Sequence, residues 1–287
     1  MGENESLVRL IATDLDGTLL RSDHKTVSAR TRRALAAARE AEITIVLVSA
    51  RGPAGVGEVA DLAGCDGLAI CSNGALVLDL SSREVVRHRP LAADVAAEIV
   101  RSLRRRLPNV CFATEIEGLF ALEPAFKAWD YWEPPAEASY GDALELVAAP
   151  VTKLIARDAT CSVAELAAAA HEVGGDGVAV GVAGEWVIEI SAAGVNKSAA
   201  LKELASDLGV EPAAVVAFGD YPNDLPMLEW AGYSIAPANA HRDVLAVVDE
   251  VTASNDEDGV ALAIERLLRD ESGQASATRQ ARQARLR

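Results

Sequence analysis

The sequence predicts an α/β protein with a doubly wound, Rossmann-like core of parallel strands, into which a smaller α+β domain is inserted. Three observations support this class. Short apolar runs alternate with helical patterns at both ends of the chain, as is typical of a parallel sheet covered on both faces. The middle of the chain instead shows paired strands and most of the aromatic residues. Polar residues, finally, follow the core strands at the points where those strands end.

Both ends of the chain alternate strands and helices. The expected elements are strand Leu7–Thr13, helix Ser28–Glu40, strand Ile43–Val48, a helix opening at Pro53, strand Gly67–Cys71, helix Lys197–Leu208, strand Val215–Phe218 and helix Leu225–Trp230. Ser28 is expected to cap its helix, because a serine hydroxyl accepts a hydrogen bond from a free backbone N–H of the first turn. Strands separated by helices in this way pair in parallel, which predicts one sheet built from both ends of the chain.

The middle of the chain has a different pattern. The expected elements are helix Asp94–Arg106, a hairpin over Val110–Leu122 turning at Glu117-Gly118, strand Val151–Ala156, helix Ser162–Val173 and paired strands within Val178–Ile190. Eight of the twelve Phe, Tyr and Trp residues fall here, which supports a separate unit. We therefore assign residues 1–84 and 190–270 to the core, 85–189 to an inserted α+β cap, and 271–287 to a disordered basic tail.

The composition excludes several classes of protein. Half of the 287 residues are hydrophobic, which excludes a mainly disordered chain. The formal charge of −16 argues against a nucleic-acid-binding surface, and no apolar run approaches the roughly 20 residues that span a membrane. The polar N-terminus predicts no secretory signal, and the four cysteines are typical of a reducing compartment. We therefore expect a cytoplasmic protein with a small-molecule partner, as a monomer or a small homo-oligomer.

Four strand ends of the predicted core carry polar side chains. The segments are Asp14-Leu15-Asp16-Gly17-Thr18 after the first strand, Ser49 and Arg51 after the second, Ser72-Asn73-Gly74 after the third, and Gly219-Asp220 after strand Val215–Phe218. A single pair of acids would only indicate a solvated turn. In a doubly wound sheet, however, ligands bind beyond the carboxyl ends of the strands. Hydroxyl, amide and carboxylate groups at four such ends therefore predict one site at this edge.

The acidic residues of this set predict a metal site. Asp220 and Asp224 are four residues apart, so a helix starting here would place both carboxylates on one side. Together with Asp14 they form an all-oxygen, negative pocket that suits Mg²⁺ rather than zinc, and no histidine lies near these motifs. Either acid alone would be explained by the preference of carboxylates for a helix N-terminus. Lys197 opens a helix against the dipole, which indicates a nearby anion, either phosphate or Asp14 itself.

Several segments together resemble a known family in their order and spacing. They are Asp14-Leu15-Asp16-Gly17-Thr18-Leu19-Leu20, Ser49-Ala50-Arg51, Ser72-Asn73-Gly74-Ala75, Lys197, Gly219-Asp220 with Asn223-Asp224, and Ser254-Asn255-Asp256-Glu257-Asp258-Gly259-Val260. The set resembles the haloacid dehalogenase-like hydrolases, and within them the Cof-like sugar-phosphatase branch, whose α+β cap is inserted between the second and third motifs. The resemblance covers about residues 7–269.

The resemblance implies a Mg²⁺-dependent phosphatase, a phosphoric monoester hydrolase that works through an aspartyl-phosphate. Asp14 would be the nucleophile that attacks phosphorus, and Asp16 would protonate the leaving oxygen and then activate water. The implied metal ligands are Asp14, the backbone carbonyl of Asp16, Asp220 and, directly or through water, Asp224. The implied phosphate-binding groups are Ser49, the Leu15 and Ala50 amides, Asn223 and Lys197.

The natural substrate stays open at this point. The resemblance implies that the cap covers the site as a mobile lid and contacts the leaving group, so the cap is expected to set specificity. Candidate substrate contacts are Arg51, Asn73, Gly74 and the cap residues Trp129 and Trp132, whose rings could stack on a sugar, flavin or pyridoxal ring. The expected substrate is a small phosphorylated metabolite such as a sugar phosphate, FMN or PLP. A phosphosugar mutase of the same superfamily and a receiver-like phosphoacceptor protein are the alternatives.

Overall fold

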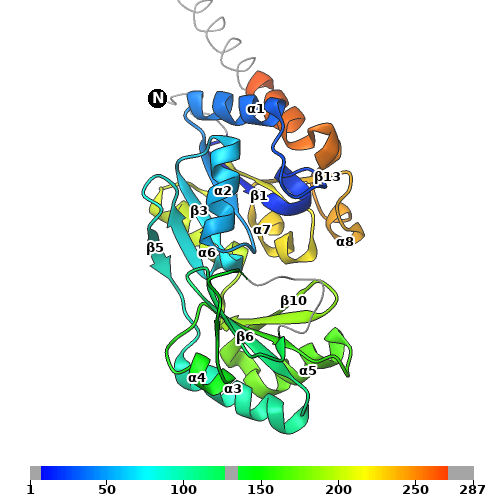
Figure 1. Cartoon of the computed structure of the whole chain (residues 1–287). Coiled ribbons are helices and arrows are strands. Elements are labelled where there is room, and N and C mark those ends of the chain that lie inside the picture. Colours follow the sequence, from blue (N-terminus) through cyan, green and yellow to red (C-terminus); the bar gives the residue numbers. More distant parts are fainter. Residues whose placement is uncertain (1–7, 127–134, 271–287) are drawn as a thin grey trace, which may run out of the picture.

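The computed structural model describes residues 8–126 and 135–270, and these residues form two β-sheets with helices packed against them (Figure 1). The larger sheet has eight strands in the order β14-β13-β12-β1-β2-β3-β4-β5, and the smaller has six in the order β10-β11-β9-β6-β7-β8. The smaller sheet comes from the middle of the chain, while the larger is built from both ends. The fold is therefore the predicted α/β core with an inserted α+β cap.

Six neighbouring strands of the core sheet are parallel. They are β14 (Glu250–Thr252), β13 (Tyr233–Pro237), β12 (Val215–Phe218), β1 (Leu10–Asp14), β2 (Thr44–Val48) and β3 (Leu68–Cys71). Parallel pairing aligns their carboxyl ends, since Asp14 is the register partner of Val48 and Thr13 that of Phe218. Because β1 lies between β2 and β12, the loop that follows it meets the loops after both neighbours.

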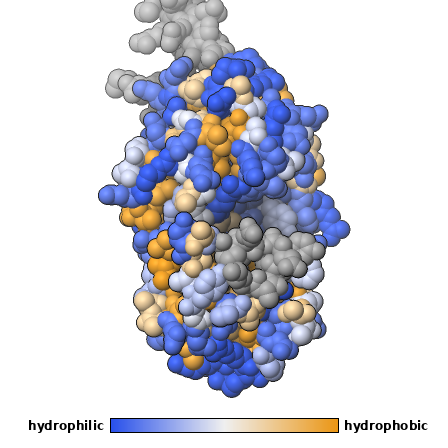
Figure 2. Space-filling view, viewed as in Figure 1, coloured by the Kyte–Doolittle hydropathy of each residue, from blue (hydrophilic) through white to orange (hydrophobic). Residues whose placement is uncertain are grey.

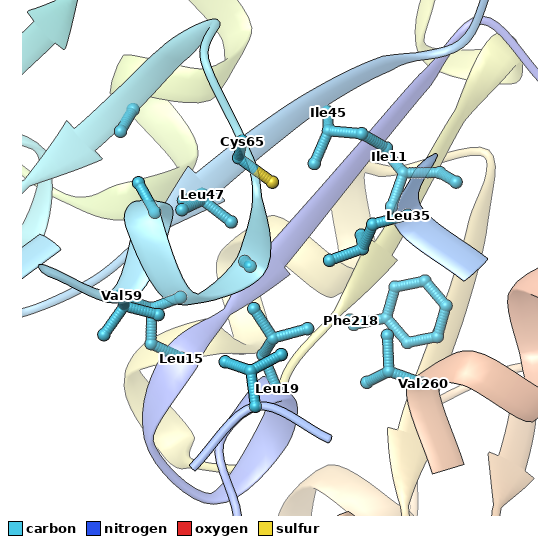
Figure 3. Packing of buried hydrophobic residues seen from close by; sticks show 14 of the residues in the cluster. Ile11, Leu15, Leu19, Leu35, Ile45, Leu47, Val59, Cys65, Phe218 and Val260 are labelled. Carbon is cyan, nitrogen blue, oxygen red and sulfur yellow. The ribbon is translucent and has the colours of Figure 1, made fainter. Parts of the chain in front are cut away.

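Helices cover both faces of the core sheet because its central strands are apolar on both sides. One face carries α1 (Ala29–Glu40), α2 (Pro53–Ala63) and the helix of residues 259–270; the other carries α6 (Lys197–Asp207), α7 (Leu225–Trp230) and α8 (Arg242–Leu245). Ile11 packs with the first group (Figure 3), and Leu10 and Ala12 pack with the second. The Ser28 hydroxyl accepts a hydrogen bond of 3.0 Å from Thr31 N, which confirms the predicted cap of α1.

The cap sheet is largely antiparallel. Its strands are β6 (Cys111–Ile116), β7 (Leu119–Leu122), β8 (Ser139–Tyr140), β9 (Lys153–Arg157), β10 (Val178–Ala183) and β11 (Val187–Ala192), and its helices are α3 (Ala93–Arg106), α4 (Ala143–Leu146) and α5 (Val163–Gly174). Phe112 and Ile188 pack with α3 and α5 on one face. Alternate residues along a strand point to opposite faces. Glu115, Lys153 and Glu189 therefore face away from these helices.

The structure differs from the sequence prediction at the edges of the cap. β4 (Leu76–Asp79) and β5 (Val85–His88) extend the core sheet by antiparallel pairing beyond β3. The core sheet is therefore mixed, and residues 85–88, which were predicted to belong to the cap, are part of it. β11 continues to Ala192, beyond the expected end of the cap at residue 189. β5 has four residues, which are too few for an alternation of apolar and polar residues to distinguish a strand from a linker.

The surface in the view of Figure 2 is mostly hydrophilic, and its apolar residues form scattered groups. Isolated apolar side chains at a surface are ordinary in folded proteins. Within residues 8–126 and 135–270, no helix is both long enough and apolar enough to cross a membrane. The expected basic tail, residues 271–287, and the predicted substrate contacts Trp129 and Trp132 lie outside the described residues.

Candidate active site

The residues predicted for catalysis meet at the carboxyl end of β1. Asp14 is the last residue of β1 and is 5% exposed. The chain then turns at once through Leu15–Leu19, where Gly17 has a φ of +81°, a left-handed conformation that favours glycine. A Cβ at this position would also overlap Asp220 Oδ2. Gly17 therefore lets the loop after β1 approach the loop after β12 closely.

Three carboxylates and one lysine form the centre of the site. Asp14, Asp220 and Asp224 each place a carboxylate oxygen within 4.8 Å of the other two. Lys197, in the first turn of α6 and 2% exposed, donates one hydrogen bond of 2.6 Å to Asp14 Oδ1 and another of 2.6 Å to Asp224 Oδ1. The anion that the position of Lys197 indicated is thus Asp14 together with Asp224.

The charges in this group are not balanced. Burial raises the pKa of Asp14 well above its ordinary value, and although Lys197 opposes this rise, the two neighbouring carboxylates add to it. Burial also raises the pKa of Asp220 to about 6, with the charge of Asp224 acting in the same direction. Burial lowers the pKa of Lys197, but its two aspartate partners outweigh burial and raise it. One lysine among three carboxylates thus leaves an excess of negative charge.

The donor set fits a hard divalent cation. The three candidate ligands offer carboxylate oxygens, which Mg²⁺ prefers over the nitrogen and sulfur ligands typical of zinc. A cation among them would relieve the repulsion that helps to raise the pKa of Asp14 and of Asp220. The group of three aspartates is therefore consistent with a divalent-metal site.

Mg²⁺ should stabilise the protein more at about pH 7.5 than at about pH 5. The pKa of Asp220 is raised from 3.8 to about 6 in the metal-free protein, so at the lower pH a metal must displace a proton. The folded state binds this proton more tightly than the unfolded state does. Asp220 therefore makes the metal-free protein progressively less stable as the pH rises from 3.8 to about 6. Thermal unfolding with and without Mg²⁺ at both pH values tests this. Equal Mg²⁺-induced shifts in Tm would contradict it.

The carboxylates of Asp220 and Asp224 are close together, but not because they lie on one face of a helix as predicted. A short 3₁₀ turn, Pro222–Asp224, precedes α7, and Asp220 lies outside both. Asp224 Oδ2 instead accepts hydrogen bonds of 3.1 Å from the backbone N–H of Asp220 and 3.1 Å from that of Tyr221. The two carboxylates are therefore brought together by a closed loop and not by helical spacing.

Asp16, the predicted acid/base, is held by two basic side chains. Arg51 donates to it at 2.7 Å from Nε and at 2.5 Å from Nη2, and His24 Nδ1 lies 3.0 Å from Asp16 Oδ1. Burial raises the pKa of Asp16, but the hydrogen bonds and charges of Arg51 and His24 outweigh burial and lower it. Arg51, a predicted substrate contact, is thus bound to Asp16. The prediction that no histidine lies near these motifs is therefore wrong for His24, because a lone histidine in a loop carries no pattern that would place it.

Ser49 and Ala50, predicted to bind phosphate, follow β2 directly. Because Asp14 and Val48 are register partners, Ser49 lies beside the loop that begins at Leu15. Ser49 is 1% exposed, and its Oγ accepts a hydrogen bond of 3.0 Å from the backbone N–H two residues later. The register therefore places the segments that hold three of the predicted phosphate-binding groups next to the end of β1.

The loop after β3 contacts both the loop after β12 and the start of α6. Asn223 Nδ2 donates a hydrogen bond of 3.2 Å to Asn73 Oδ1. Gly74 has a φ of +101°, and a Cβ there would overlap the backbone oxygen of Asn196. Gly74 therefore acts through close packing, by letting the first turn of α6, which carries Lys197, approach β3.

Two asparagines near the end of the chain fix the loop after β1. Asn239 Nδ2 donates to Gly17 O at 2.8 Å, and Asn255 Nδ2 donates to Leu20 O at 2.9 Å. Asn255 N also donates to Asn239 Oδ1 at 2.9 Å. The family resemblance includes Ser254–Val260 but implies no role for Asn255, and the structure shows that this residue supports the backbone beyond Asp14.

A cavity of about 750 Å³ adjoins these residues. Asn73, Lys197 and Asn223 line it from the core, while β10 and Glu189 line it from the cap. The volume is that of a pocket for a whole small molecule rather than for a phosphate alone. The cap strands therefore contribute a wall of the cavity next to Lys197.

Comparison with known proteins identifies the family. Residues 11–264 match the model of the haloacid dehalogenase-like hydrolases. YxeH of Bacillus subtilis is 30% identical over 270 residues, covering 91% of this chain and 99% of that protein. The pyridoxal phosphate phosphatase YbhA of Escherichia coli is 27% identical over 277 residues, covering 88% of this chain and 96% of YbhA. The crystal structure of a haloacid dehalogenase-like hydrolase from Bacteroides thetaiotaomicron matches with a TM-score of 0.74 and 26% identity, over 91% of this chain and 99% of that one.

A core sheet, an inserted cap and an acidic group at the end of β1 define a capped phosphohydrolase. The chain belongs to the haloacid dehalogenase-like hydrolases, in their Cof-like branch, and is a phosphoric monoester hydrolase that acts on small phosphorylated compounds. It is also 32% identical over 269 residues to the chloroplastic endoribonuclease YBEY of Arabidopsis thaliana, but it spans only about half of that protein, 46% of its length.

Proposed function

We propose that the protein hydrolyses its phosphomonoester in a Mg²⁺-dependent reaction through an aspartyl-phosphate on Asp14. The observation that carries this proposal is the group of three aspartates, of which Asp14 and Asp224 are buried and bridged by Lys197. A carboxylate beside a fixed ammonium and a metal site is suited to attack a phosphoryl group that would otherwise repel it. The family match over residues 11–264 supports the reaction class.

The reaction would proceed in two displacements. In the first, an Asp14 carboxylate oxygen attacks phosphorus, the bond from phosphorus to the ester oxygen breaks, and Asp16 gives that oxygen a proton. Asp16 Oδ2 accepts a hydrogen bond of 2.7 Å from Arg51 Nε, and its second lone pair can carry the proton that passes to the leaving oxygen. In the second, Asp16 takes a proton from water, whose oxygen displaces Asp14 from phosphorus and releases inorganic phosphate.

The remaining groups would hold the phosphoryl oxygens and the metal. The proposed phosphate-binding groups are Ser49, Asn223, Lys197 and the Leu15 and Ala50 amides. The proposed metal ligands are Asp14, Asp220 and the backbone carbonyl of Asp16. When bound, Mg²⁺ supplies positive charge that offsets repulsion between the nucleophile and the phosphoryl oxygens. Asp224 accepts three protein hydrogen bonds, two of them on Oδ2, so we propose that Asp224 reaches the metal through water and orients Lys197.

Activity should require a hard divalent cation. Release of nitrophenol from p-nitrophenyl phosphate should fall to background in excess EDTA and return when Mg²⁺ is added, because carboxylate oxygens favour this ion. Undiminished activity in EDTA, or recovery with zinc alone, would show that the acidic group does not serve a magnesium-dependent reaction.

The candidate substrates are sugar phosphates, FMN and PLP, and the name of the Escherichia coli relative supports PLP as one to test. A panel of phosphorylated metabolites assayed for free phosphate in the presence of Mg²⁺ identifies the substrate. The same panel tests the alternative of a phosphosugar mutase, which would yield an isomerised ester. Hydrolysis is favoured because a mutase must bind a second phosphate, and no uncommitted cation lines the cavity among the described residues.

A further inference from the structure

The substrate cavity contains one charged side chain from the cap. Among the described residues that line the cavity, only Lys197 and Glu189 carry a charge. Lys197 is already bound to Asp14 and Asp224 at the catalytic end. Glu189, from β11, has no part in the reaction proposed above. Its carboxylate is the charged group that the part of a bound ester beyond the phosphate would meet.

Glu189 is held in place from both sides of the boundary between cap and core. Its Oε1 accepts a hydrogen bond of 2.6 Å from Lys153 Nζ, and its Oε2 accepts one of 2.9 Å from Asn73 Nδ2. Asn73 in turn accepts the hydrogen bond of 3.2 Å from Asn223, a proposed phosphate-binding residue. Each carboxylate oxygen has a second lone pair, so Glu189 can still accept a hydrogen bond from a ligand.

Lys153 is shared between Glu189 and a second carboxylate. Lys153 is 4% exposed and also lies 3.1 Å from Oε2 of Glu115, which is fully buried. One ammonium shared by two carboxylates leaves this group with an excess negative charge. Glu115 does not line the cavity, whereas Glu189 does. Lys153 does not line it either, so the member of this group that a ligand would meet is the Glu189 carboxylate.

We propose that Glu189 is a specificity-determining residue that selects phosphate esters whose leaving group carries no negative charge. It accepts hydrogen bonds from hydroxyl or N–H groups of a neutral leaving group and repels a carboxylate or a second phosphate. In a partly buried cavity, one such repulsion weakens binding by roughly tenfold or more. The inference rests on the phosphatase function proposed above and narrows its substrates by charge.

Two small esters that share a carbon skeleton test the proposal. Glycerol 3-phosphate ends in a hydroxymethyl group where 3-phosphoglycerate has a carboxylate. Each ester is titrated as an inhibitor of p-nitrophenyl phosphate hydrolysis in the presence of Mg²⁺. The ratio of the two inhibition constants is compared between proteins, because this ratio does not depend on the fraction of enzyme that is folded. Wild-type protein should bind glycerol 3-phosphate about tenfold more tightly or better, and Glu189→Gln should reduce this preference by about tenfold.

Two variants separate this effect from general changes in charge or shape. Glu189→Asp keeps the charge and should retain the preference to within about threefold. Glu185→Gln removes a charge from the exposed turn of the same hairpin, outside the cavity, and should leave the preference unchanged. The proposal would be overturned if the preference were unchanged in Glu189→Gln or changed equally in Glu185→Gln. It would also be overturned if wild-type protein bound both esters alike or bound neither. Failure of wild-type protein to hydrolyse p-nitrophenyl phosphate would instead overturn the proposed function.

Discussion

Replacing Asp14 by asparagine should lower phosphatase turnover by about 10⁴-fold or more and abolish the phosphoenzyme. The amide is similar in size but has no nucleophilic oxygen, so no covalent bond to phosphorus forms. The substitution also removes one of three clustered carboxylates, and Lys197 keeps Asp224 as a partner, so the protein should remain folded. Acid quenching during turnover of a radiolabelled phosphate ester measures the protein-bound phosphate, which hydroxylamine should release if the link is an acyl phosphate.

Asp16→Asn is the matched control, since it makes the same change two residues away in the same loop. The nucleophile remains, so the phosphoenzyme should still form from p-nitrophenyl phosphate, whose leaving group departs without a proton. It should then hydrolyse slowly because no general base activates water. Esters with poor leaving groups should lose the most activity. Protein-bound phosphate in Asp14→Asn at the wild-type level would assign the nucleophile to another residue.

The sequence predicts those parts of the site that depend on strand ends. Asp14, Ser49 and Asn73 lie at or just after the ends of apolar core strands, and parallel pairing brings such residues to one edge whatever path the loops take. A short, continuous apolar run between two helices is also a clear signal for a buried parallel strand. The fold class and the composition of the acidic group follow from these patterns, because both depend on the order of elements and not on side-chain conformation.

Contacts between side chains of separate segments are not encoded in such patterns. The contacts of Asp16 with Arg51 and His24 depend on the path of three loops. Lys153 and Glu115 are register partners in neighbouring cap strands, and a pattern of apolar residues does not specify which charged residues will be opposite each other. The sequence also did not place β5 in the core sheet, because a strand of four residues is too short to show an alternating pattern.

Replacing Lys153 by methionine should lower the free energy of unfolding by about 3–5 kcal/mol. Burial alone would lower the pKa of Lys153, but Glu189 and Glu115 outweigh burial and raise it, so the lysine stays charged. Methionine preserves much of the apolar volume of the side chain. It leaves the fully buried Glu115 without the ammonium that lies 3.1 Å away, and leaves two carboxylates close together on one face of the cap sheet.

Two further variants distinguish a charge effect from a packing effect in this experiment. Lys25→Met changes an exposed lysine in the loop before α1 and should alter the free energy of unfolding by less than about 0.5 kcal/mol. The double variant Lys153→Met/Glu115→Gln removes the buried carboxylate together with the ammonium that it was paired with. The glutamine can still accept the hydrogen bond that Ser72 Oγ donates to Glu115 Oε1 at 2.7 Å. The double variant should therefore recover at least about half of the loss. Urea unfolding followed by circular dichroism measures all three, and a double variant less stable than Lys153→Met would attribute the loss to packing.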